Sequence, residues 1–126
     1  MEGAQTTILV VEDEPAHLDL LKRIFEDAGY RVLGAQDGTE AKEVYRGSAK
    51  EIDLVLCDMA LPKLGGWTVY LSLKEINPRV KMILTSGYLD AKVKSDFVKA
   101  GVKDFIAKPY IAETILESVR QVLGSS

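Results

Sequence analysis

The chain has 126 residues, of which 47% are hydrophobic and 28% charged, so it is long enough to form one domain with a buried core. Its 16 basic and 19 acidic residues give a net charge of −3, which argues against direct binding to nucleic acid or to an anionic membrane. The single cysteine, Cys57, leaves no internal disulfide bond, and no apolar stretch approaches the roughly 18 residues of a membrane span. These features predict a cytoplasmic protein.

Short apolar runs alternate with amphipathic stretches five times, a pattern typical of strands and helices around a parallel sheet that is buried on both faces. The predicted strands are Thr7–Val11, Arg31–Ala35, Asp53–Cys57, Lys81–Thr85 and Asp104–Ile106. The predicted helices begin at Glu14-Pro15, after Asp37-Gly38, and near Gly66, Asp90 and Ile111, and they end at Gly29, Gly47-Ser48, Asn77-Pro78, Ala100 and Leu123. We therefore predict one doubly wound, three-layer α/β domain with a five-stranded parallel sheet over residues 7–123, with tails at 1–6 and 124–126.

Acidic residues end two of the apolar runs. Glu12 and Asp13 follow the first predicted strand, and Asp58 follows the third. If these strands are neighbours, the three carboxylates meet at the edge where open α/β sheets bind ligands. Carboxylates this close repel one another, and Mg²⁺ relieves the repulsion while keeping coordination positions open for a phosphoryl group. We expect Asp13 to bind Mg²⁺ directly and Glu12 to act through water, with the backbone carbonyl of Ala60 completing the protein ligands.

Ser86 and Lys108 follow the fourth and fifth predicted strands, at the same edge of the sheet. Phosphoryl transfer is accelerated mainly by positioning and by neutralising charge on the phosphoryl oxygens with metal ions, cations and hydrogen-bond donors. We therefore expect Asp58 to be the nucleophile, which forms an aspartyl phosphate. Lys108 and the Ser86 hydroxyl are then expected to bind phosphoryl oxygens.

Short motifs surround these residues. They are Val10-Val11-Glu12-Asp13-Glu14-Pro15, Asp58-Met59-Ala60-Leu61-Pro62 with Gly65-Gly66, Thr85-Ser86-Gly87-Tyr88, and Lys108-Pro109. Together they resemble the motifs of response-regulator receiver domains, and the resemblance extends from about Thr6 to Leu123. It implies a flavodoxin-like fold, a phosphoacceptor role for Asp58 and a typically cis Lys108–Pro109 bond. It also implies a signalling domain of a two-component system that catalyses only its own Mg²⁺-dependent phosphorylation and dephosphorylation.

The resemblance further implies a conformational switch. Thr85 and Ser86 are adjacent hydroxyl candidates, and the family's spacing back from Lys108 selects Ser86. Phe105 lies where the family carries its switch aromatic residue. The phosphoryl group would draw Ser86 inward, Phe105 would follow, and the surface of the fourth helix, fifth strand and fifth helix would change. We expect this surface to contact a downstream protein or a second copy of the chain, and the phosphodonor to be a histidine kinase or histidine phosphotransfer protein.

Each of these residues also has a simpler interpretation when it is taken alone. Asp13 could cap the first helix, Asp58 could lie in a turn, Ser86 could be a loop hydroxyl, and Lys108 could be a solvated surface lysine. Phe105 could be an ordinary core residue. The occurrence of all the polar candidates at strand ends of one predicted sheet favours the shared site.

Other functional classes fit the sequence less well. A haloacid-dehalogenase-type phosphatase uses an aspartate nucleophile and Mg²⁺, but it needs a second aspartate where this chain has Ala60. A flavin- or nucleotide-binding module needs a phosphate-binding loop after the first strand, and Glu12-Asp13-Glu14 would repel phosphate without a metal. A phosphohistidine carrier centred on His17 is disfavoured because such carriers are usually helical bundles. The main alternative is a receiver-like interaction module that no longer needs phosphorylation.

Overall fold

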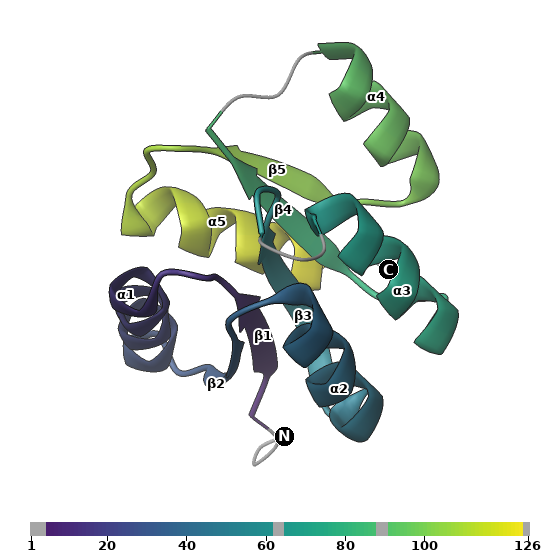
Figure 1. The fold of residues 1–126 in the computed structure, drawn as a ribbon. Helices are drawn as coiled ribbons and strands as arrows, with labels where there is room; N and C mark the ends of the chain where they lie inside the picture. Colours follow the sequence, from purple (N-terminus) through teal and green to yellow (C-terminus); the bar gives the residue numbers. More distant parts are fainter. Residues whose placement is uncertain (1–4, 62–64, 88–90, 125–126) are drawn as a thin grey trace.

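The computed structural model describes residues 5–61, 65–87 and 91–124. Within these ranges, five parallel strands form one sheet in the order β2-β1-β3-β4-β5 (Figure 1). The strands are β1 (Thr7–Val11), β2 (Arg31–Ala35), β3 (Ile52–Asp58), β4 (Met82–Ser86) and β5 (Asp104–Ala107). The helices are α1 (Pro15–Asp27), α2 (Gly38–Ser48), α3 (Gly66–Ile76), α4 (Ala91–Ala100) and α5 (Ala112–Leu123). The prediction of a doubly wound α/β domain is confirmed.

Two polar residues lie inside strands rather than just after them. Asp58 is the last residue of β3 and pairs with Thr85, and Ser86 is the last residue of β4 and pairs with Ala107. The strand predictions stopped one residue short because they followed apolar side chains, whereas the ladder is made by backbone groups that polar residues also carry. The predicted helix start at Asp90 and the motif residues Pro62 and Tyr88 lie outside the described residues.

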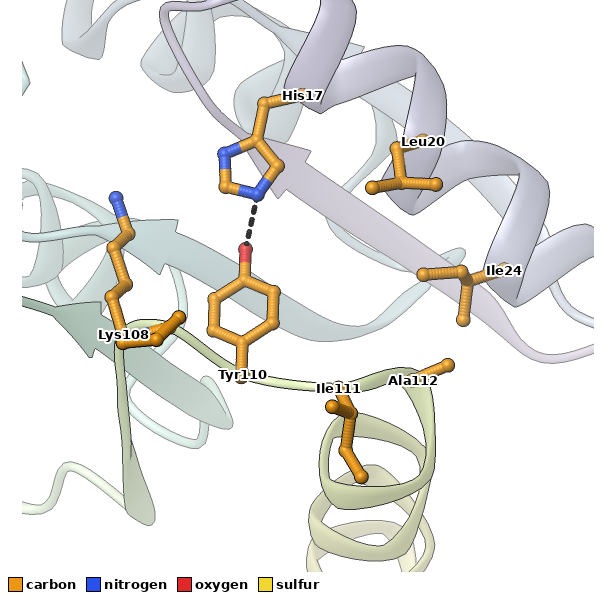
Figure 2. Close-up of a pocket in the computed structure, with 8 residues that line it drawn as sticks. His17, Leu20, Ile24, Lys108, Tyr110, Ile111 and Ala112 are labelled. Atoms are coloured by element: carbon orange, nitrogen blue, oxygen red, sulfur yellow. Dashed lines mark hydrogen bonds between the residues drawn. The ribbon is translucent and has the colours of Figure 1, made fainter.

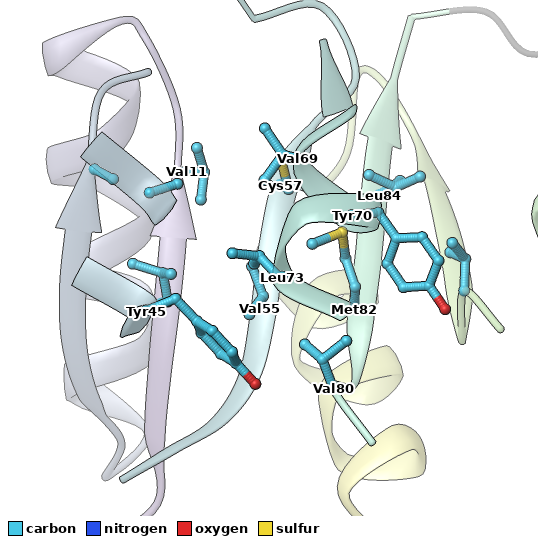
Figure 3. Close-up of a cluster of buried hydrophobic side chains, with 14 of the residues drawn as sticks. Val11, Tyr45, Val55, Cys57, Val69, Tyr70, Leu73, Val80, Met82 and Leu84 are labelled. Atoms are coloured by element: carbon cyan, nitrogen blue, oxygen red, sulfur yellow. The ribbon is translucent and has the colours of Figure 1, made fainter. Parts of the chain in front are cut away.

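The helices cover both faces of the sheet. On one face, α1 and α5 pack through buried residues that include Leu21, Phe25 and Val119. On the other face, α2, α3 and α4 enclose the second cluster, which includes Tyr45 and Leu73 (Figure 3). Burying one such side chain contributes roughly 1.5–3 kcal/mol. No helix in the described part of the chain combines the length and the apolar character needed to cross a membrane.

Gly66 allows α3 to approach the end of β3. A Cβ atom on this residue would lie 2.9 Å from the Asp58 carbonyl oxygen and 2.9 Å from the Met59 Cα atom, both of which belong to the backbone. The Gly66 N–H donates to the Met59 carbonyl at 2.9 Å, which fixes the first turn of α3 against this segment. A larger side chain would push the helix away from Asp58, because the backbone cannot rotate aside as a flexible side chain can.

The ends of two helices follow the sequence pattern. Gly29 and Gly101 have positive φ angles of 97° and 118° just after α1 and α4, where the sequence predicted helix stops. At the other end of α1, Glu14 is the N-cap residue and makes no side-chain capping bond. The simpler interpretation of Asp13 as the cap of α1 is therefore wrong, and its carboxylate is left for the acidic cluster described below.

Candidate functional site

Three carboxylates meet at the C-terminal ends of β1 and β3. Because these strands are hydrogen-bonded neighbours, with Val11 opposite Cys57, the residues that follow them lie side by side. One oxygen each from Glu12, Asp13 and Asp58 lies within 4.8 Å of the other two. Oxygens bound to one Mg²⁺ at about 2.1 Å can lie up to about 4.2 Å apart, so small side-chain movements suffice for shared coordination. The residues therefore fit Mg²⁺, which prefers such an all-oxygen set.

Two of the three carboxylates are shielded from water. Glu12 is 3% exposed and Asp58 is 5% exposed, whereas Asp13 is open to solvent. Burial raises the pKa of Glu12, and the nearby charge of Asp58 raises it further. The Glu14 N–H donates to Glu12 Oε2 at 3.3 Å and partly opposes this rise in pKa. A cation at the cluster would favour the charged form of Glu12, so ion binding and deprotonation are linked.

The two oxygens of Asp58 have different partners. Lys108 Nζ donates to Asp58 Oδ2 at 2.9 Å, and the Ala60 N–H donates to Oδ1 at 3.0 Å. The Lys108 side chain is 28% exposed and forms this charge-assisted bond, so it is not simply a solvated surface lysine. The carboxylate of Asp58 is thus oriented from two sides, next to a cation that can also interact with phosphoryl oxygens.

Ser86 lies beside the backbone of Lys108. The Lys108 N–H donates to the Ser86 carbonyl at 2.8 Å, and the Lys108–Pro109 peptide bond is cis, as the resemblance implied. Ser86 is half-buried, whereas Thr85 is buried in β4 opposite Asp58, in agreement with its expected place as a strand residue. The contact of the Ser86 hydroxyl with a phosphoryl oxygen and that of the Ala60 carbonyl with a metal ion remain predictions.

An aromatic stack lies on the α3 and α4 side of the site. Trp67 and Phe97 stack with ring centroids 4.4 Å apart at 8°, and Phe97 stacks on Phe105 at 6.0 Å and 27°. Lys94 Nζ lies 5.8 Å from the Phe105 ring centroid. Sequence reasoning missed Phe97. Helical periodicity could have placed Phe97 on the inner face of α4, although it could not have named its aromatic partners.

A polar contact joins α1 to the start of α5 on the opposite side of the site (Figure 2). His17 Nδ1 lies 3.4 Å from Glu12 Oε1, and His17 Nε2 lies 2.9 Å from the Tyr110 hydroxyl. The two rings stack at 5.6 Å. They border an apolar groove of about 700 Å³, which is also lined by Leu20 and Ile111. Burial and the acidic residues raise the pKa of Tyr110. Sequence reasoning missed this contact.

A sequence profile of the response regulator receiver domain matches residues 8–120. The chain belongs to this family. It is 32% identical over 118 residues to chemotaxis protein CheY of Bacillus subtilis (strain 168), covering 93% of this chain and 97% of that protein. This receiver is also 33% identical over 109 residues to the transcriptional regulatory protein ZraR of Klebsiella oxytoca, covering 86% of this chain and 24% of ZraR. The chain thus spans about a quarter of the length of that regulator.

A solved structure supports both the fold and the metal chemistry of this receiver. The receiver domain of sensor histidine kinase PA1611 from Pseudomonas aeruginosa PAO1 has a TM-score of 0.83 and 27% identity, covering 97% of this chain and all of that one. It holds a magnesium ion in its active-site cleft. Receiver domains of two-component systems bind Mg²⁺ at an acidic pocket, and Glu12, Asp13 and Asp58 form such a cluster here.

Proposed function

We propose that this receiver accepts a phosphoryl group on Asp58 in a Mg²⁺-dependent reaction and thereby switches its surface for a partner. The observation that carries the proposal is the environment of Asp58. Its carboxylate is bound by Lys108 at 2.9 Å and by the Ala60 N–H at 3.0 Å, and it lies within 4.8 Å of Glu12 and Asp13. These contacts support the proposal because they bring the expected nucleophile, a lysine cation and the expected metal-binding acid pair together at one sheet edge.

The chemistry follows from these positions. A carboxylate oxygen of Asp58 attacks the phosphorus in line, the new P–O bond forms, and the bond to the donor nitrogen breaks with its electrons leaving on that nitrogen. Lys108 transfers its hydrogen bond from Asp58 to a phosphoryl oxygen, and the Ser86 hydroxyl donates to another. Asp13 and Asp58 would hold Mg²⁺, with Glu12 acting through water and the Ala60 carbonyl as a further ligand, and the bound ion would neutralise charge on the phosphoryl oxygens.

We further propose that the aromatic stack carries the switch. Movement of Ser86 toward the phosphoryl group would change the packing of Phe105, which contacts Phe97 on α4. Phe97 also contacts Trp67 at the start of α3, so a change at Phe105 would reach two helices. The altered surface of α4, β5 and α5 would then bind a downstream protein or a second copy of the chain.

We propose a histidine kinase or a histidine phosphotransfer protein as the phosphodonor, and the cytoplasm as the location. The similarity to a receiver domain of a sensor histidine kinase supports this class of donor. The domain would act as an enzyme only on itself, because the proposed nucleophile is consumed in each phosphorylation and restored by hydrolysis.

The test is phosphorylation by acetyl phosphate, measured as intact protein mass. With Mg²⁺, the wild-type chain should gain one phosphoryl group, and chelation of the metal should abolish the gain. Asp58→Asn should remove it as well, whereas Asp96→Asn, a matched change on the exposed face of α4, should not. No mass gain in a folded wild-type protein would contradict the proposal and favour the phosphorylation-independent interaction module.

A further inference from the structure

A second set of ligand atoms lies beside the acidic cluster. One atom each from Glu12, Glu14 and His17 lies within 4.8 Å of the other two. This set shares Glu12 with the magnesium cluster but replaces Asp13 and Asp58 with a carboxylate and an imidazole. Glu14 is exposed and His17 is 24% exposed, so solvent ions can reach the set directly. The two sets therefore offer different chemistry on either side of one buried carboxylate.

The His17 ring is oriented as a metal ligand would be. Its Nδ1 atom faces Glu12 Oε1 at 3.4 Å, while Nε2 lies 2.9 Å from the Tyr110 hydroxyl. Figure 2 shows this ring between α1 and the segment before α5, with the hydrogen bond to Tyr110. Histidines that bind metals usually donate their second ring N–H to an oxygen, which fixes the ring and its tautomer. Tyr110 is in the position of such a partner, outside the set of ligands itself.

His17 and Tyr110 carry the same number of protons with and without a bound ion. Without an ion, the Tyr110 hydroxyl can donate to Nε2 while Nδ1–H faces Glu12. With an ion on Nδ1, the ring proton lies on Nε2 and donates to the Tyr110 oxygen, because a hydroxyl can both donate and accept. Only the tautomer changes, and no proton is gained or lost by His17 or Tyr110.

The ligand types indicate the class of ion. Imidazole suits Zn²⁺ and related transition-metal ions, whereas Mg²⁺ prefers oxygen ligands and keeps several waters. Zn²⁺ binds nitrogen and carboxylate oxygen at about 2.0–2.2 Å and leaves a fourth position to water when three protein ligands are present. We propose that Glu12, Glu14 and His17 form a binding site for a zinc-class ion, with Tyr110 positioning the imidazole.

The shared carboxylate makes the site regulatory. Glu12 cannot serve both ions equally well, and an ion at His17 places a second positive charge next to the magnesium cluster. Zinc therefore weakens Mg²⁺ binding and slows phosphoryl transfer to Asp58. This consequence rests on the proposed function, whereas zinc binding itself does not.

The first test is calorimetric titration of the full chain with zinc chloride in the absence of Mg²⁺. Glu14→Gln and His17→Gln should each weaken zinc binding at least tenfold. Tyr110→Phe keeps the ring and removes the hydroxyl, and it should weaken binding about 10–100-fold. Glu26→Gln, an exposed change on the same helix, should leave zinc affinity unchanged, and Asp13→Asn, which removes a nearby charge but no ligand of this site, should weaken zinc binding less than either ligand variant does.

Two results would overturn the site. One is unchanged zinc affinity in both Glu14→Gln and His17→Gln; the other is a larger loss of zinc affinity in Asp13→Asn than in those two variants, which would place the ion in the magnesium cluster. Because Glu14 is exposed, its variant is expected to fold, and thermal unfolding would verify this for all variants.

A second titration measures the consequence for Mg²⁺. Mg²⁺ binding is measured by Trp67 fluorescence. Saturating zinc should raise the apparent Mg²⁺ dissociation constant at least tenfold in the wild type and leave it unchanged in Glu14→Gln. An unchanged constant would contradict the regulatory inference. Acetyl phosphate labelling without zinc tests the function of Asp58 separately, so failure of the zinc site and failure of the phosphoacceptor are distinguishable.

Discussion

The two sides of Asp58 differ in chemistry although they adjoin the same sheet edge. On the α1 and α5 side, Glu12, His17 and Tyr110 form a polar chain with contacts of 3.4 and 2.9 Å. On the α3 and α4 side, aromatic rings are stacked from Trp67 to Phe105. Charged and polar contacts respond to ions and phosphoryl groups, whereas packed rings respond to displacement. We therefore propose that ions and the phosphoryl group act on the polar side, and that the stacked rings carry the resulting displacement to α3 and α4.

The energetics of the two sides differ in the same way. Burial raises the pKa of Glu12, so the charge on the polar side is costly until a cation arrives. On the aromatic side, burial itself is favourable, and stacked pairs contribute about 0.5–1.5 kcal/mol beyond the area that they bury. Substitutions should therefore affect ion chemistry on one side and stability on the other.

The largest effect is expected from Phe97→Ala. This side chain is 9% exposed and lies between Trp67 and Phe105, so its removal should lower the free energy of unfolding by about 3–5 kcal/mol. Urea unfolding measures the change. Val98→Ala, on the exposed face of α4, is the control and should change stability by less than about 0.5 kcal/mol. Equal losses of stability in the two variants would show that the aromatic stack contributes no more than an exposed side chain does.

Lys108→Ala should impair phosphoryl transfer to Asp58 with little effect on the aromatic stack. Loss of the cation that contacts Asp58 should slow phosphorylation by acetyl phosphate about 10²–10³-fold, the usual cost of removing one preorganised charge-stabilising group. The rate of mass gain measures this change. The exposed residue Lys103 supplies the control, Lys103→Ala, whose rate should match that of the wild type. A wild-type rate in Lys108→Ala would show that Lys108 has no part in the reaction.

Glu12→Gln should stabilise the metal-free protein at neutral pH. The pKa of Glu12 is raised from an ordinary value of 4.5, so the folded state holds this proton more tightly than the unfolded chain does. Wild-type stability should then fall as the pH rises from about 4.5 through the folded pKa, and this loss should be absent in Glu12→Gln. Thermal unfolding in a chelator measures it, with Glu26→Gln as the control. A decline that persists in Glu12→Gln would assign it to another group.

The smallest effect is expected from Lys94→Gln. The ammonium lies 5.8 Å from the Phe105 ring centroid at an exposed site, and losing this contact should cost about 0.5–1 kcal/mol. Urea unfolding at matched salt measures the change, and Lys92→Gln is the control. A loss of the same size in both variants would indicate net charge rather than the ring contact.

The sequence was sufficient to predict the fold and the acidic cluster. Continuous apolar runs marked the buried parallel strands, and the rule that their carboxyl ends share one edge brought Glu12, Asp13 and Asp58 together. The strand ends at Asp58 and Ser86 were less predictable, because backbone pairing continues through polar residues.

The contacts between distant elements were beyond sequence reasoning. His17 and Tyr110 are 93 positions apart, and their hydrogen bond depends on how α1 lies against the segment before α5. The Trp67–Phe97 stack likewise depends on the relative orientation of α3 and α4. Helical periodicity gives the inward face of each helix, but it does not give the rotation and shift that decide which side chains meet.

The most direct measurement is the site of phosphorylation. The protein would be incubated with acetyl phosphate and Mg²⁺ and reduced with borohydride, which converts an aspartyl phosphate to homoserine, and its peptides would be sequenced by mass spectrometry. We predict homoserine at position 58, formed only when Mg²⁺ is present. A reduced residue at position 12 or 13, phosphate retained on Ser86, or no modification of the folded protein would contradict it.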